Sequence, residues 1–325
     1  MKIAITEKIR PFSHTPGIRI PIPNSHFVLQ AFPALFRIEG IADFPLHVTG
    51  PIQEFTAQLD LEKQAIWIWG VAKEGHYRFK IEMCHEGIAL QIDRCPKEGI
   101  RIQDKCYLRK SQVLLYPIAS DIEKKRVEKL FLGVHKAQDW DLVWRRMDLK
   151  EIAPALFLLG QYAPKAQEAT GAVADLLKDS FPLFVSAAFS DLLVPRVYDL
   201  DYQGIASNQE GGGDPFSLLE RSYRKMRGDL LQQANGVISI LPHLPKEWDA
   251  GRATNLCVEE LGDLDLEWSR SLIRKMMLRA KKVGRPVFHF SNAIRRYRLN
   301  GKWIERGEEI QIEAARVYLF DQFQK

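Results

Sequence analysis

The stretch "GVISILPHLPKEWDAGRATNLCVEELGDLDLEW", residues 236–268, marks the point where the character of the chain changes. In residues 118–235, immediately before it, apolar residues recur every three or four positions, and within and after it short apolar runs alternate with turn residues. Pro242 and Pro245 each fix φ at about −65° and favour extended geometry in the preceding residue, so "LPHLP" is typical of a stiff strut. We predict that this strut joins the last helix to a closing β layer. Trp248 and Trp268 are expected to pack against that layer.

Working outward from this stretch, the chain divides into three regions. Residues 1–117 contain runs such as "AIWIWGVA" (65–72) that indicate strands. Residues 118–235 have the helical period of three to four. Residues 236–325 return to strands, with a hairpin turn predicted at Asn300–Gly301. The predicted fold class is α+β, with an N-terminal β-sandwich-like domain, a central helical region and a C-terminal β domain.

Composition sets limits on the partners of the protein. The chain has 325 residues, of which 46% are hydrophobic, so it can bury a large core. Its formal net charge of +5 is spread along the chain and does not by itself require a nucleic-acid or membrane partner. No phosphate-binding GxxxxGK[ST], dinucleotide-binding GxGxxG or nucleophile-elbow GxSxG motif occurs. We therefore expect no cofactor and no membrane partner, and we regard nucleic-acid binding as the weaker alternative. The oligomeric state stays open.

The cysteines and the first residues bear on compartment. Cys84, Cys95, Cys106 and Cys257 form no CxxC pair, and their spacings do not match a zinc site. The first residues lack the apolar core of a secretory signal, and no apolar run approaches the length of a membrane span. The sequence thus predicts a reduced cytoplasmic protein without a bound metal.

Two stretches, residues 228–268 and 297–323, resemble glycoside hydrolases of the (α/α)6-barrel, six-hairpin kind, notably the family ninety-five α-L-fucosidases. In that family the last barrel helix passes through a proline-containing junction into a C-terminal β domain. A complete barrel needs twelve helices, or on the order of 200 residues, whereas the helical region here has about 115. The resemblance therefore implies either a truncated α/α toroid or a different helical arrangement between two β layers. The matching residues are Leu230, Leu231, Gly236, Leu241, Pro242, Leu244, Pro245, Trp248, Gly251, Asp265, Glu267 and Trp268.

The resemblance directs the search for a site to "YDLDYQGIASNQEGGGDPF", residues 198–216, because related barrel enzymes carry a functional Asp near a glycine before the last helix. Inverting hydrolysis needs a carboxylic acid and a carboxylate base about 6.5 to 9.5 Å apart. Glu210 and Asp214 are the candidate catalytic pair. The same residues also fit a solvated turn in which Asp214 caps the following helix. The candidate substrate-binding residues are Asn208, Gln209, Tyr202, Asp201 and Trp140.

Three function classes follow. The first is a glycoside-hydrolase-like protein that acts on or binds a carbohydrate, the second a non-catalytic descendant that binds a glycan or a protein. The third is a basic RNA-binding protein, suggested by "IRKMMLRAKKVGR" (273–285) and "IRRYRLNGK" (294–302), which also fit charged edge strands. Trp67 and Trp69 lie on one face of a predicted strand, where sheet packing is favoured over ligand stacking.

Overall fold

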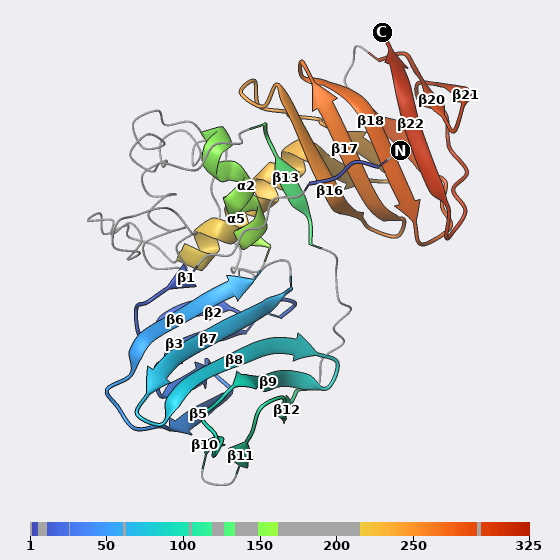
Figure 1. Cartoon of the computed structure of the whole chain (residues 1–325). Helices are drawn as coiled ribbons and strands as arrows, with labels where there is room; N and C mark the ends of the chain where they lie inside the picture. The colour runs from blue at the N-terminus through green and yellow to red at the C-terminus, as the bar shows by residue number, and fades with distance from the viewer. Residues whose placement is uncertain are drawn as a thin grey trace.

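The computed structural model describes residues 2–5, 12–25, 27–60, 63–103, 106–118, 127–133, 149–161, 215–290 and 294–325. Most of the described elements are β-strands, which form four sheets (Figure 1). The two helices among these residues are α2 (Leu149–Gly160) and α5 (Pro215–Leu230). Neither is both long and apolar enough to cross a membrane.

The N-terminal unit contains two six-stranded antiparallel sheets, shown in blue and teal in Figure 1. Sheet 1 has the strand order β1-β6-β7-β8-β9-β12, and sheet 2 has the order β11-β10-β5-β4-β3-β2. The strands of sheet 1 are β1 (Phe12–Ser13), β6 (Gln53–Asp60), β7 (Ala65–Ala72), β8 (Gly75–Cys84), β9 (Gly87–Arg94) and β12 (Val113–Pro117). Those of sheet 2 are β11 (Cys106–Leu108), β10 (Ile100–Ile102), β5 (Ala42–His47), β4 (Leu35–Ile38), β3 (Val28–Phe32) and β2 (Ile18–Pro21).

The two sheets pack face to face because their strands alternate. In β7 and β8 nearly every second side chain is buried, which is the period expected for a strand with one face in a core. Phe36 of β4 meets Phe79 of β8 edge to face, with ring centroids 5.1 Å apart. The hydroxyl of Tyr77 donates to the backbone carbonyl of Pro33 at 2.7 Å. The apolar alternation of these strands thus builds one core between the sheets.

The C-terminal unit contains sheet 3, with the order β13-β16-β17-β18-β22-β20-β21, and sheet 4, with the order β14-β15-β19. Phe288 of sheet 4 packs edge to face on Phe320 of sheet 3, at a centroid distance of 5.0 Å. The strands of sheet 3 are β13 (Lys129–Phe131), β16 (Ala250–Val258), β17 (Gly262–Ser269), β18 (Leu272–Ala280), β22 (Val317–Gln324), β20 (Arg296–Leu299) and β21 (Lys302–Glu305). Those of sheet 4 are β14 (Leu231–Ala234), β15 (Val237–Ile240) and β19 (Val287–His289).

A hairpin replaces the predicted end of the last helix. The sequence predicts helix up to residue 235, but α5 ends at Leu230 and β14 begins at the next residue. Asn235 and Gly236, with φ of 51° and 77°, form the two-residue turn between β14 and β15. Positive φ at both positions is typical of a type I′ turn, for which Asn-Gly is the preferred pair. The predicted turn at Asn300–Gly301 is confirmed, with φ of 47° and 88°.

The predicted fold class is wrong. The described residues form mainly antiparallel sheets, and within them no helical toroid is present. β13 lies in the stretch assigned to helices, yet it pairs with β16, matching Lys129 to Thr254 and Leu130 to Ala253. Local periodicity does not reveal that a short segment pairs with a strand far along the chain. The stretch that contains β13 is therefore predicted to be helical. The division into three domains at residues 117 and 235 stays a prediction.

The resemblance to (α/α)6-barrel glycosidases is wrong for the same structural reason. The two stretches that carry it, residues 228–268 and 297–323, fold largely into sheets 3 and 4. Among the described residues the helical part consists of α2 and α5, which is not compatible with such a barrel.

The helices α2 and α5 pack against each other at a close approach. The rings of Phe157 and Tyr223 lie 5.1 Å apart. Gly160 allows this contact, because a Cβ at that position would lie 2.6 Å from the Cβ of Tyr223. Any larger residue at position 160 would push the helices apart.

The proline strut of the opening stretch lies between β15 and β16. Leu241, at its start, has φ of 52°, and its N–H donates to the carbonyl of Leu230 at the end of α5 over 2.9 Å. Trp248 and Trp268 are 3% and 1% exposed, and the Trp268 indole donates to the Trp248 carbonyl at 2.8 Å. Their predicted packing role is therefore confirmed.

Candidate functional site

The sequence-predicted site cannot be placed. Its catalytic pair, Glu210 and Asp214, lies outside the described residues. Their convergence and the alternative helix-capping role of Asp214 both stay predictions. The predicted substrate-binding residues Asn208, Gln209, Tyr202, Asp201 and Trp140 also lie outside the described residues.

A different site emerges on the outer face of sheet 1. In β7, Ile66 and Ile68 are fully buried against the core, whereas Trp67 and Trp69 point to the opposite face and are half-buried. A strand turns successive side chains to opposite faces, so the sequence "IWIW" places both indoles on the outer surface.

The register of sheet 1 surrounds these indoles with polar groups. Trp67 lies between Gln58 of β6 and Lys80 of β8. Trp69 lies opposite Arg78 of β8, and β9 follows on the far side of that strand. Paired residues share one face of a sheet, so an aromatic stripe is bordered by amide and cationic side chains.

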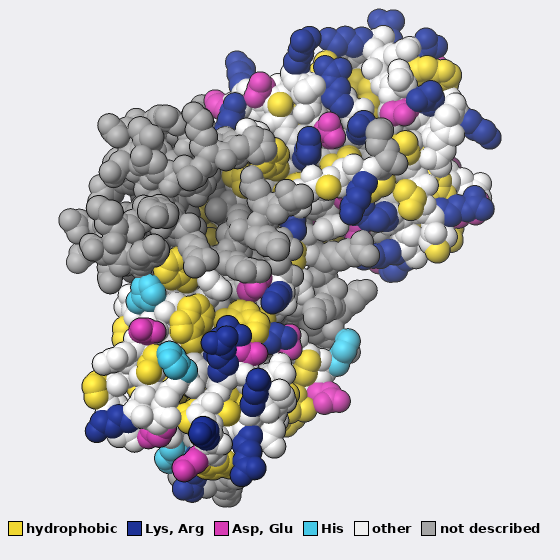
Figure 2. Space-filling model, in the orientation of Figure 1, with side chains coloured by type: hydrophobic (Ala, Val, Ile, Leu, Met, Phe, Trp, Pro, Cys, Tyr) yellow, Lys and Arg dark blue, Asp and Glu magenta, His cyan; other side chains and the backbone are white. Residues whose placement is uncertain are grey.

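This face is hollowed. A cavity of about 330 Å³ opens on sheet 1, a volume at the lower end of small-molecule sites. Figure 2 shows Lys and Arg side chains gathered among hydrophobic and His side chains on the face formed by β6 to β9. We call this cavity the tryptophan hollow. It is lined by Gln58, Asp60, Lys63, Trp67, Trp69, His76, Tyr77, Arg78 and Arg94.

The two tryptophans differ in their neighbours. The Trp67 ring is contacted by two cations, with the Lys63 Nζ at 5.5 Å and the Arg78 guanidinium at 5.2 Å from its centroid. Both distances lie within the range of a cation–π interaction. Arg78 also donates from Nε to the Asp93 carboxylate at 2.6 Å. Trp67 therefore helps to hold two cations in place.

The floor of the hollow is rigid. Asp60 is 2% exposed, and one of its carboxylate oxygens accepts the backbone N–H of Lys63 at 3.0 Å. Burial raises the pKa of the Tyr77 hydroxyl, which stays protonated and donates to the Pro33 carbonyl in the turn between β3 and β4. Both side chains are thus held by hydrogen bonds within the protein.

The lining favours binding over hydrolysis. Asp60 is the one carboxylate among the described residues that line the hollow. Hydrolysis of a glycosidic bond by the usual route requires two. The hollow instead offers a mixture of donors, acceptors and flat apolar rings.

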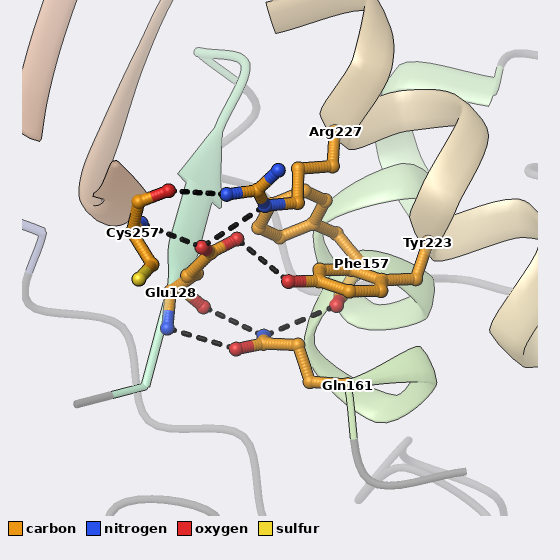
Figure 3. A network of polar contacts seen from close by, with 6 residues as sticks. All are labelled: Glu128, Phe157, Gln161, Tyr223, Arg227 and Cys257. Atoms are coloured by element: carbon orange, nitrogen blue, oxygen red, sulfur yellow. Dashed lines mark hydrogen bonds and ion pairs between the residues drawn. The ribbon is translucent and has the colours of Figure 1, made fainter. Parts of the chain in front are cut away.

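A second polar cluster lies between the helices and sheet 3 (Figure 3). Glu128, 4% exposed, precedes β13. Its carboxylate accepts from the Tyr223 hydroxyl at 2.8 Å, the Cys257 N–H at 2.8 Å and Arg227 Nε at 3.2 Å. Arg227 also donates to the Cys257 carbonyl. We call this set the Glu128 network.

Gln161 extends the Glu128 network to α2. Its amide oxygen accepts the Glu128 N–H at 2.9 Å, and its amide nitrogen donates to the Glu128 carbonyl at 2.8 Å. The same nitrogen donates to the Phe157 carbonyl at 3.2 Å. Because the carboxylate, the guanidinium and the amide are all engaged inside the protein, we interpret the Glu128 network as a structural joint.

Other chemistries find little support in the described part of the chain. There, no three His, Cys, Asp or Glu side chains come together to hold a metal. Several cations of the two basic segments form ion pairs: Arg279 with Asp265, Lys281 with Asp263, Lys282 with Glu260, and Arg298 with Asp321.

No protein-family model matches the chain, and no curated protein does either. The glycosidase resemblance therefore has no support from these comparisons, in agreement with the fold.

Sequence reasoning missed the tryptophan hollow, although a signal was present. In "IWIW" the isoleucines and the tryptophans must face opposite sides of the strand. Isoleucine is more often fully buried than tryptophan, so the alternation assigns the tryptophans to the outer face. The same pattern fits tryptophans that pack against another layer of the protein. The sequence does not show whether such a layer covers this face.

Proposed function

We propose that the protein binds a carbohydrate in the tryptophan hollow. The observation that carries the proposal is the placement of Trp67 and Trp69 on one face of β7, inside a cavity that the half-buried Gln58 also lines. A sugar ring has apolar C–H faces and a rim of hydroxyls. Flat indoles match the faces, and fixed donors and acceptors match the rim.

The roles of the lining residues follow from their contacts. Trp69 provides the stacking surface, since both cation–ring contacts in the hollow involve Trp67. The amide of Gln58 both donates and accepts hydrogen bonds, as the hydroxyls of a sugar require. Hydrolysis by Glu210 and Asp214 remains a separate prediction. The ion pairs of the basic segments argue against the RNA-binding alternative.

Screening the full chain on a glycan array, followed by calorimetric titration of the best ligand, tests the proposal. We expect Trp69→Ala to weaken binding by about 30-fold, the effect of losing about 2 kcal/mol at an aromatic hot spot. Trp303→Ala is the matched control, because Trp303 is 46% exposed on β21 in the other unit.

Circular dichroism of both variants establishes that they are folded. The proposal is wrong if no glycan binds the full chain, or if a folded Trp69→Ala variant binds as well as the control.

A further inference from the structure

The tryptophan hollow has an uneven charge distribution. Lys63, Arg78 and Arg94 line it together with a single described carboxylate, that of Asp60. The exposed imidazole of His76 lines it as well. Sugar binding alone does not require this excess of cations.

Two of these cations oppose each other across neighbouring strands. Arg78 of β8 is the register partner of Arg94 of β9, at an irregularity between Arg78 and Phe79. Like charges placed directly opposite in a sheet destabilise it. Asp93, next to Arg94 in sequence, pairs with Arg78 and offsets part of this repulsion.

The charge of Arg94 is not paired with any described residue. Its side chain is exposed, and among the described residues it has no hydrogen bond or ion pair. Arg78 is held by the Trp67 ring and by Asp93, so one guanidinium is fixed while the other is available. An oxyanion between the two would relieve the repulsion and gain charge-assisted hydrogen bonds.

We infer that the tryptophan hollow selects an acidic saccharide, whose oxyanion binds at Arg78 and Arg94 while a sugar ring stacks on Trp69. This inference rests on the proposed function. The recognised chemistry is a carboxylate of a uronic acid or a sulfate ester. Arginine forks bind either group in a bidentate manner.

The test is a calorimetric titration of the full chain with four probes. These are a tetragalacturonate, its carboxyl-reduced neutral counterpart, a sulfated heparin-derived tetrasaccharide, and inorganic sulfate. The two acidic saccharides distinguish carboxylate from sulfate as the source of the oxyanion. We expect at least one of them to bind about tenfold more tightly than the neutral saccharide at low salt, with the difference shrinking as salt is raised.

The variant Arg94→Gln isolates the charge, because the Arg94 side chain forms no hydrogen bond or ion pair with another described residue. Because one charged donor is removed, we expect the affinity for the acidic saccharide to fall about tenfold. The affinity for the neutral saccharide should change by no more than about twofold. Arg109→Gln is the control, since Arg109 is exposed and does not line the hollow.

The inference is overturned by equal affinity for acidic and neutral saccharides, or by an Arg94→Gln variant whose affinity for the acidic saccharide is unchanged. The proposed function still stands in either case if Trp69→Ala weakens binding by about 30-fold. If inorganic sulfate binds and none of the saccharides does, both the inference and the proposed function are overturned.

Discussion

Glu128 places a carboxylate where water does not reach it. Three protein donors replace the lost hydration: Tyr223, Arg227 and the Cys257 N–H. Burial, together with the nearby Glu128 carboxylate, raises the pKa of Tyr223, so its hydroxyl remains a donor at any physiological pH. Removing one donor leaves a buried charge under-solvated, which costs more than an ordinary hydrogen bond contributes.

The substitution Tyr223→Phe tests this cost at one atom. It deletes a hydroxyl and keeps the ring that packs on Phe157. We expect the free energy of unfolding, measured by urea denaturation, to fall by about 1–3 kcal/mol.

Tyr107→Phe is the matched control, because Tyr107 is 51% exposed. It should change the free energy of unfolding by no more than about 0.5 kcal/mol. If both variants have the same free energy of unfolding, the interpretation of the Glu128 network as a structural joint is wrong.

Single residues also show where sequence reasoning reached its limit. The burial of Trp248 and Trp268 followed from the proline strut and is confirmed. Glu128 gave no signal, since its partners come from α5 and from β16, far along the chain. A buried ion pair depends on three-dimensional proximity, and local sequence does not encode that proximity.

At the scale of elements, β20 and β22 are joined by a cross-strand ion pair. Arg298 donates twice to Asp321, from Nε at 2.7 Å and from Nη2 at 2.9 Å, and the two residues are register partners. The Arg298 guanidinium lowers the pKa of the Asp321 carboxyl below its usual value. The stability it contributes is therefore present above the unfolded-state pKa of about 3.9 and is lost as the pH falls through the folded-state value.

Asp321→Asn should lower the melting temperature at pH 7 and make the difference from the natural chain shrink below about pH 4. Thermal denaturation, followed by circular dichroism over about five pH units from about pH 2 to about pH 7, measures this difference in melting temperature. The exposed Glu247→Gln serves as the control and should not reproduce this convergence. A gap that persists unchanged at low pH would contradict the assignment.

Elements with strict alternation were predictable, and those that depend on distant partners were not. "AIWIWGVA" forms β7 over the whole of residues 65–72. By contrast, Leu230 and Leu231 fit a helix or a strand equally well. The helical region is therefore predicted to run up to residue 235, whereas β14 already begins at Leu231 and leads into the Asn235–Gly236 turn. β13 has three residues, too few for any period to be read, and its identity depends on pairing with β16.

At the scale of the whole molecule, the described residues that line the tryptophan hollow all belong to the N-terminal unit. Its lining residues come from sheet 1 and the turns that join its strands. The core between sheets 1 and 2 is made by their own side chains, such as Phe44 and Tyr116, whose rings meet edge to face at 5.6 Å. The described lining residues and the core beneath them thus lie within residues 12–118.

A fragment of residues 12–118 should therefore fold alone. We expect a β-rich circular dichroism spectrum and a single cooperative thermal transition, as for a sandwich with a closed core. Its affinity for the glycan found with the full chain should agree within about threefold, or about 0.7 kcal/mol. An unfolded fragment would mean that the rest of the chain supports the sandwich.

The pairing of β13 with β16 has a consequence for biosynthesis. β13 leaves the ribosome well before its partner exists, because roughly 125 residues separate Lys129 from Thr254 and translation adds about 5–20 residues per second. For on the order of ten seconds this strand and the buried Glu128 beside it have no partner in β16. The N-terminal sandwich can form during that interval, whereas the edge of sheet 3 that β13 completes is a late assembly step, exposed to chaperones and to neighbouring nascent chains.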